Sequence, residues 1–429
     1  MTQHSPSIPK PLPRVAAYER LGFGLFLHWG LYSQLGQGEW VQHLKPVPMA
    51  QYEQLAQTFT AAEFDARAIA RLAREAGQKY ICLTTRHHDG FSLYDTRGLS
   101  DFDAPHSGAR RDLVAEFVAG CREEGIVPFF YHTSLDWRWD SAHCDQRKWN
   151  DYLDFFHASI EVLCTHYGEV GGFFFDGHWS RSDLDWKDDR LYGLIRRLQP
   201  DSIILNNSGL HARGAVGHPE IDAVTFEQGL PVAPDRTGAP KYLAGEMNQT
   251  FNAHWGIGSE DFRYLGPPQI IETLCACRKV GANYLLNVGP TAQGAIPDYE
   301  AATLRLLGQW IGAHPDAIYN ARPSPVRCRG RDFCLESDDG TLFYFAHGLT
   351  IDGGADVTVE EATRSGEGNG ARPLAHLHRR ITGARWADNG EELEFAQNPA
   401  NGLTTLNCTT YRYGVQRVVR VAQIQTESA

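Results

Sequence analysis

Paired cysteines, long apolar runs and clusters of basic residues are all missing from the 429-residue sequence. Its nine cysteines include no Cys-x-x-Cys pair, which is typical of reduced, mostly buried thiols in a cytosolic protein. No stretch approaches the ~20 apolar residues of a membrane-spanning helix, and the proline-containing N-terminus lacks the apolar core of a signal peptide. We therefore expect a cytoplasmic protein without a membrane partner.

The charge balance is acidic, with a formal net charge of -12. No run of Lys and Arg forms the basic surface that a polyanion needs, which argues against a nucleic-acid partner. Aromatic residues, in contrast, make up 11% of the chain and include ten Trp. Aromatic rings stack against sugars, although packing of a core would also account for this content. The sequence leaves open whether the protein is a monomer or a homo-oligomer.

The order of hydrophobic segments predicts an α/β protein with two domains. In the first part of the chain, eight short apolar segments alternate with helical stretches, and each ends in polar residues. The predicted strands lie at 21–27, 80–85, 127–131, 173–175, 203–205, 223–226, 242–244 and 284–286. Eight parallel strands with helices between them form a (β/α)8 TIM-like barrel, expected over residues 1–320. Short strand-like segments separated by Asp-Gly and Asn-Gly turns predict a C-terminal antiparallel β-sandwich over 321–429.

The fourth predicted strand is the clearest marker of a functional site. Phe173, Phe174 and Phe175 cannot alternate between core and water, so both faces of this strand must be buried. Asp176 follows directly, and Gly177 lets the backbone turn beside it. Because the active sites of barrels lie at the C-terminal ends of the strands, Asp176 is a candidate catalytic carboxylate.

Polar side chains also follow the other predicted strands. The strand-end candidates are His28, His87, His88, Asp89, Tyr131, His132, Asp136, Asp176, His178, Asn206, Glu227, Glu246 and Asn287. Five tryptophans lie close to them in the sequence, namely Trp29, Trp40, Trp137, Trp179 and Trp255. Two carboxyl groups with imidazoles, amides and indoles around them suit glycoside cleavage, in which one carboxylate attacks and one carboxylic acid protonates the leaving oxygen.

The motifs at these positions resemble those of one known family. They are His28-Trp29-Gly30, Glu39-Trp40, His87-His88-Asp89-Gly90-Phe91, Leu135-Asp136-Trp137, Phe175-Asp176-Gly177 and Leu286-Asn287-Val288-Gly289-Pro290. In this order they look like the α-L-fucosidases of glycoside hydrolase family 29, over roughly residues 20–320. The resemblance implies a retaining exo-α-L-fucosidase that needs no cofactor. Such an enzyme hydrolyses terminal α-L-fucosyl linkages of oligosaccharides or glycoconjugates through a covalent fucosyl-enzyme intermediate.

The resemblance also implies roles for individual residues. The family's nucleophile falls on Asp176. The segment 222–227 is similar to the family's acid/base segment and places that role at Glu227, with Glu246 as runner-up and Glu39 as a third candidate. The expected substrate-binding residues are His28, Glu39, Trp40, His87, His88, Tyr131, Trp179 and Glu246. The chain has Asn206-Asn207-Ser208 where many members have Asn-Asp-Arg, so a substrate contact from that Arg is not expected.

Two other kinds of protein fit parts of this pattern. A metal-dependent barrel hydrolase would use the histidines at the strand ends and Asp176 as ligands. Such barrels usually carry a His-x-His pair on the first strand, whereas here Trp29-Gly30 follows His28, so we expect no metal site. A non-catalytic sugar-binding protein would need the His and Trp residues, but not two carboxylates at the correct spacing.

Overall fold

A computed structural model describes residues 8–207, 217–234, 236, 239–352 and 368–427 of the chain. Ser208, in the segment that departs from the family pattern, lies outside these residues. The chain divides into two compact units. One comprises residues 1–265 and 282–305, and the other comprises residues 266–281 and 306–429.

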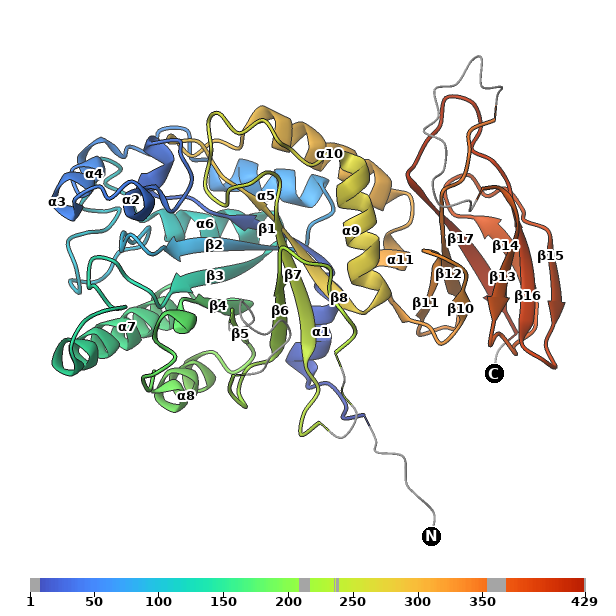
Figure 1. The fold of residues 1–429 in the computed structure, drawn as a ribbon, viewed down its shortest axis with the longest axis horizontal. Helices are drawn as coiled ribbons and strands as arrows, with labels where there is room; N and C mark the ends of the chain where they lie inside the picture. Colours follow the sequence, from blue (N-terminus) through green and yellow to red (C-terminus); the bar gives the residue numbers. More distant parts are fainter. Residues whose placement is uncertain (1–7, 208–216, 235, 237–238, 353–367, 428–429) are drawn as a thin grey trace, which may run out of the picture. The chain divides into compact units, whose positions relative to one another are not determined.

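The first unit is built around a closed barrel of parallel strands, which pair in sequence order (Figure 1). The strands are β1 (Phe23–Leu27), β2 (Tyr80–Arg86), β3 (Val127–Thr133), β4 (Gly172–Asp176), β5 (Ile203–Asn206), β6 (Ala223–Glu227), β7 (Ala244–Thr250) and β8 (Ala282–Val288). β8 pairs with β1 and closes the ring, with Phe26 opposite Asn287. The (β/α)8 barrel predicted from the sequence is confirmed.

The helices begin and end where local chemistry favours it. They are α1 (Pro13–Leu21), η1 (Leu31–Gln34), α2 (Val41–Leu44), α3 (Met49–Tyr52), α4 (Leu55–Thr58), α5 (Ala66–Glu75), α6 (Leu113–Glu123), α7 (Gln146–His166), η2 (His178–Arg181), α8 (Asp188–Leu198), α9 (Pro267–Lys279), α10 (Asp298–Gly312) and α11 (Pro315–Tyr319). Asp65, Asp112 and Asp145 cap α5, α6 and α7 by accepting a backbone N–H of the first turn. Gly77 and Gly125 follow α5 and α6 with φ of 83° and 69°, a left-handed conformation that turns the chain toward the next strand.

Strand β7 differs from its prediction. The sequence suggested a strand over 242–244 that ends near Glu246, whereas β7 runs from Ala244 to Thr250. Glu246 is therefore the third residue of the strand and pairs with Thr225 and Asn283 of its neighbours. The polar residues Glu246 and Asn248 made the strand interior look like a loop. Because side chains alternate along a strand, Asn248 is the next residue to face the barrel interior and lies nearer its C-terminal rim.

Helix α1 supplies the packing at the N-terminal end of the barrel. The rings of Tyr18 and Tyr80 meet edge to face with centroids 6.0 Å apart, and Phe129 packs against both. The amide of Asn283 donates a hydrogen bond of 2.7 Å to the Tyr18 carbonyl. These side chains belong to a buried cluster inside the barrel, and the candidate site residues lie at the opposite, C-terminal ends of the strands.

The second unit contains two antiparallel sheets. Its strands are β9 (Ala321–Pro323), β10 (Arg327–Cys328), β11 (Phe333–Ser337), β12 (Leu342–His347), β13 (Gly370–Ala375), β14 (Ile381–Trp386), β15 (Phe395–Asn398), β16 (Leu403–Cys408) and β17 (Val419–Thr426). One sheet has the order β10-β13-β16-β15 and the other the order β14-β17-β12-β11-β9. Leu374 and Leu406 of the first sheet share one buried core with Leu342, Tyr344 and Trp386 of the second. The predicted β-sandwich is confirmed.

Candidate active site

A pocket of about 80 Å³ opens at the C-terminal ends of the barrel strands. Its lining consists of Phe26, His28, Trp40, His87, His88, Tyr131, Phe174, Asp176, Trp179, Asn207, Glu227, Asn248 and Trp255. These residues come from strands and loops that are far apart in the sequence and meet because all strands of the barrel run in the same direction. All the residues predicted to be catalytic or substrate-binding line this pocket except Glu39 and Glu246.

Asp176 is the last residue of β4, and both oxygens of its side chain accept hydrogen bonds. The Tyr131 hydroxyl donates to Oδ2 at 2.9 Å, and the Trp179 indole donates to Oδ1 at 3.0 Å. The backbone carbonyl of Asp176 accepts bonds from the amide and hydroxyl of Ser134, at 2.6 and 2.9 Å. The carboxylate is therefore fixed in orientation, yet its side chain keeps 15% of its surface exposed toward the pocket.

Glu227 ends β6 and is linked to Asp176 through one side chain. The amide nitrogen of Asn207 lies 2.5 Å from Glu227 Oε2 and 3.4 Å from Asp176 Oδ1. The Thr225 hydroxyl donates to Asn207 Oδ1 at 3.0 Å, which orients the amide so that its NH2 group faces the carboxylates. Glu227 Oε2 and Asp176 Oδ1 cannot be farther apart than the sum of their distances to the Asn207 nitrogen. That sum is below ~6.5 Å, the smallest separation of the two carboxyl groups in inverting glycosidases.

The ring nitrogens of His28 and His88 that face away from the pocket are both engaged. His28 Nδ1 bonds to Asn287 Oδ1 at 2.6 Å, and the Asn287 amide donates to the Trp255 carbonyl, which fixes the orientation of that amide. His88 Nδ1 bonds to Thr133 Oγ1 at 2.6 Å, while the Thr133 hydroxyl itself donates to a backbone carbonyl. In both neutral histidines the proton is therefore on Nδ1, and Nε2 remains an acceptor.

Burial keeps these histidines neutral. It lowers the pKa of His28 to about 3, lowers the pKa of His87 well below its usual range, and also lowers the pKa of His88. The rings of His87 and His88 lie 4.2 Å apart, so a charge on one further disfavours a charge on the other. His88 Nε2 lies 3.6 Å from Asp176 Oδ2. Neutral imidazoles here can accept hydrogen bonds from hydroxyl groups of a ligand at neutral pH.

The α-L-fucosidase family model matches residues 7–316. The chain belongs to the α-L-fucosidase family. Human tissue α-L-fucosidase (Homo sapiens) is 26% identical over 372 residues, which cover 80% of this chain and 75% of that protein. The structure of α-L-fucosidase isoenzyme 1 from Paenibacillus thiaminolyticus is 28% identical, with a TM-score of 0.79 over 97% of this chain and 99% of that one. A family 29 α-L-fucosidase from Bacteroides thetaiotaomicron shares the fold at 19% identity, with a TM-score of 0.79 over 99% and 97% of the two chains.

As a member of the α-L-fucosidase family, the protein is a glycoside hydrolase. The two glutamates absent from its pocket have structural partners instead. Glu39 Oε2 accepts the backbone N–H groups of Trp255 and Gly256, at 3.0 and 2.8 Å, and so holds the loop that carries Trp255. Glu246 accepts hydrogen bonds from the hydroxyls of Tyr18 and Tyr80 near the N-terminal end of the barrel. Neither glutamate is among the residues that line the pocket in the described structure.

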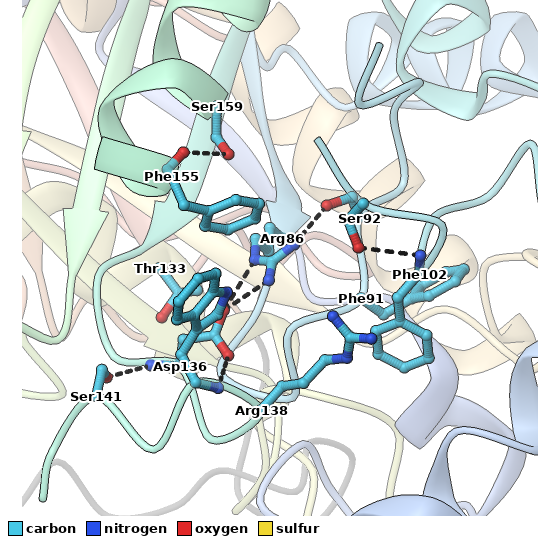
Figure 2. A network of polar contacts seen from close by, with 12 residues as sticks. Arg86, Phe91, Ser92, Phe102, Thr133, Asp136, Arg138, Ser141, Phe155 and Ser159 are labelled. Atoms are coloured by element: carbon cyan, nitrogen blue, oxygen red, sulfur yellow. Dashed lines mark hydrogen bonds and ion pairs between the residues drawn. The ribbon is translucent and has the colours of Figure 1, made fainter. Parts of the chain in front are cut away.

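Other strand-end residues of this α-L-fucosidase family member support the pocket from outside. Asp136 forms a buried ion pair with Arg86, with 2.6 Å between Oδ2 and Nη2, which Figure 2 shows at the start of the loop after β3. His178 Nδ1 bonds to the hydroxyl of Ser134, and this hydroxyl donates to the backbone carbonyl of Asp176. Asp89, His132 and Asn206 likewise bond to protein groups, namely Tyr52, Tyr94 and Tyr192.

Asn207 is a polar site residue that sequence reasoning missed. Its neighbour Asn206 was the predicted strand-end residue, but the Asn206 amide donates to Tyr192. Asn207 appeared only in the departure from the family's Asn-Asp-Arg pattern. The signal was present, because Asn207 directly follows the end of β5 between the strands that carry the two carboxylates.

The described part of the chain contains no group of three His, Cys, Asp or Glu side chains arranged as a metal site. Within the same residues, no helix combines the length and apolar character that a membrane span requires.

Proposed function

We propose that the protein is a retaining exo-α-L-fucosidase with Asp176 as nucleophile and Glu227 as acid/base. The observation that carries this proposal is the Asn207 bridge, which keeps the two carboxyl groups close to the ~5 to 5.5 Å of retaining glycosidases. The position of Asp176 also supports the assignment, since Tyr131, Trp179 and Asn207 orient a carboxylate that lines the pocket.

In the first step, Glu227 protonates the glycosidic oxygen while a carboxylate oxygen of Asp176 attacks C1 of the fucosyl residue. The bond from C1 to the leaving oxygen breaks, and an ester forms between C1 and Asp176. In the second step, the Glu227 carboxylate takes a proton from water, which attacks C1 and releases Asp176. Two inversions at C1 leave the product in its original anomeric configuration.

The pocket has two kinds of wall that suit L-fucose, a 6-deoxy sugar with three ring hydroxyls besides the anomeric one. The Nε2 acceptors of His28 and His88 and the indole of Trp40 suit the hydroxyls. Phe26, Phe174 and Trp255 line the pocket with apolar surface, and the rings of Phe26 and Trp255 meet with centroids 5.9 Å apart. We place the methyl group of the sugar against these rings, since a hydroxyl buried there would lose its hydrogen bonds.

The substrates we propose are terminal α-L-fucosides of oligosaccharides or glycoconjugates.

We also propose a cytoplasmic location, which is supported by nine cysteines that form no disulfide. Cell fractionation followed by activity assay tests that location, and recovery of the activity outside the cytoplasm would exclude it.

Proton NMR of an aryl α-L-fucoside during hydrolysis tests the mechanism. The α-anomer of L-fucose must appear before mutarotation sets in. Early appearance of the β-anomer would show inversion, and absence of hydrolysis would remove the proposed activity altogether.

A further inference from the structure

Asn248 lines the pocket but has no role in the mechanism proposed above. The residue is only 1% exposed, and neither the nitrogen nor the oxygen of its side-chain amide has a hydrogen-bond partner among the described residues. A buried amide without partners is unfavourable, because it has given up its hydrogen bonds to bulk water. Its partners must therefore come from what the pocket binds.

Strand pairing holds Asn248 beside the proposed acid/base. In the register of β6 and β7, Asn248 is directly opposite Glu227. The backbone carbonyl of Asn248 accepts the N–H of Gln228 at 2.9 Å, and on its other side β7 pairs Asn248 with Leu285 of β8. Neighbouring strands lie ~4.8 Å apart, and the side chains of Asn248 and Glu227 both line the pocket. The barrel itself therefore positions this amide next to the acid/base.

The fucosyl residue alone does not supply the partners that this amide needs. In the arrangement proposed above, its ring hydroxyls contact the histidine acceptors and Trp40. The polar atoms that remain near Glu227 are the ring oxygen and the glycosidic oxygen. Neither of these oxygens carries a hydrogen atom, so neither can donate a hydrogen bond to Oδ1 of Asn248. A donor for Oδ1 must therefore arrive at a later stage of the reaction.

Water brings two hydrogen atoms to the second step. Glu227 takes one of them as the water oxygen attacks C1, and Oδ1 of Asn248, on the neighbouring strand, can accept the other. When both hydrogen atoms are held in this way, a lone pair of the water oxygen is free to face C1, which is the geometry that attack requires. The departing alcohol has a single O–H, whose proton comes from Glu227, so this contact is available to water and not to the leaving group.

We propose that Asn248 positions the water that hydrolyses the fucosyl-enzyme intermediate. This inference rests on the proposed function and extends it. One O–H bond of water breaks as its proton passes to Glu227, the water oxygen forms a bond to C1, and the ester bond between C1 and Asp176 breaks. The other O–H of water, hydrogen-bonded to Asn248, stays intact and becomes the anomeric hydroxyl of the product.

Asn248→Leu tests this role, because leucine has nearly the shape of asparagine without its polar atoms. On an aryl α-L-fucoside with an activated leaving group, kcat/KM reports the first step, and kcat reports the second step once the intermediate accumulates. The variant should lower kcat about 10- to 100-fold and change kcat/KM less than about threefold, so that KM falls together with kcat. Mass spectrometry of enzyme quenched during turnover should show accumulated fucosyl-enzyme. Azide should restore turnover, since it carries no hydrogen atom that needs an acceptor.

Asn206→Leu is the matched control. Asn206 is also a buried amide at the end of a barrel strand, but it donates to the Tyr192 hydroxyl and does not line the pocket. Any loss of activity in this variant should affect kcat and kcat/KM equally.

The inference is overturned if Asn248→Leu loses kcat and kcat/KM equally. With an unchanged unfolding temperature, that result would make Asn248 a substrate contact, and with a lower one a structural residue. Native kinetics in Asn248→Leu would overturn the inference as well. Failure of the native enzyme to cleave the aryl fucoside would instead overturn the proposed function and this extension with it.

Discussion

The hydroxyl of Tyr131 donates a hydrogen bond of 2.9 Å to Oδ2 of Asp176. Tyr131 is buried in the third strand of the barrel and Asp176 ends the fourth, so the contact is set by the pairing of two adjacent strands. The second carboxylate oxygen is held independently by Trp179. The position of Oδ2 is therefore set by two adjacent strands of the barrel, whereas Oδ1 is held by Trp179 of η2.

Replacement of Tyr131 by Phe should lower kcat/KM on fucosides about 10- to 100-fold. A hydrogen bond to a charged group contributes ~1.5 to 3 kcal/mol, and each 1.4 kcal/mol corresponds to about a factor of ten. Steady-state kinetics measures the loss. Tyr94→Phe is the matched control, because it removes a buried hydroxyl that contacts His132 and not Asp176. Equal losses in the two variants would contradict a specific role for Tyr131.

Asn207 should be essential for activity, because its amide donates hydrogen bonds to both Asp176 and Glu227. Asn207→Asp places a third carboxylate between Asp176 and Glu227, and repulsion between like charges should reduce kcat at neutral pH by more than 100-fold. Part of the activity should return at lower pH, where the new group is protonated and again donates a hydrogen bond. Asn206→Ala, which removes the neighbouring amide that contacts Tyr192, should show no such pH signature. An unchanged pH profile for Asn207→Asp would refute the bridge.

Glu227→Ala should behave as an acid/base variant. Fucosides with poor leaving groups need protonation and should lose nearly all activity, whereas activated aryl fucosides should retain much of the first step. Azide, which needs no general base, should trap the intermediate as α-fucosyl azide. Glu246→Ala serves as the comparison, because Glu246 is bonded to Tyr18 and Tyr80 and does not line the pocket. Azide products from Glu246→Ala instead of Glu227→Ala would reverse the assignment.

Glu246 should make folding stability depend on pH. Burial raises its pKa from about 4.5 to about 7, so the folded state binds the proton more tightly than the unfolded state. Its stabilising contribution is complete below the unfolded pKa and is lost as pH rises through about 7. Thermal unfolding from pH 4.5 to 8 should show that Glu246→Gln loses less stability over this window than the native protein. Parallel curves for the two proteins would contradict a buried, proton-binding Glu246.

The fold and most of the pocket were predictable because strand ends have a simple signature. An apolar run followed by a polar residue marks where a barrel strand reaches its rim, and Asp176, Glu227 and His28 all follow this rule. Glu246 breaks it. Polar residues inside β7 face the barrel interior, where the hydroxyls of Tyr18 and Tyr80 donate to Oε2 of Glu246, and no local pattern reveals partners more than 160 residues away.

Contacts between loops also could not be predicted from the sequence. Trp40, Trp137 and Trp179 were expected near the site, but how they share the walls of the pocket and of a second cavity beside it depends on how the loops after β1, β3 and β4 pack together. The same holds for Asn207, whose function depends on the positions of Asp176 and Glu227 and not on its own neighbours in the chain.

Trapping of the covalent intermediate tests the central claim most directly. The enzyme is incubated with a 2-deoxy-2-fluoro-α-L-fucosyl donor that has an activated leaving group, and its peptides are analysed by mass spectrometry. We predict that one 2-fluorofucosyl group is attached to the side chain of Asp176 and that Asp176→Asn takes up none. Attachment to another residue, or complete turnover of the donor by the Asp176→Asn variant, would contradict the account.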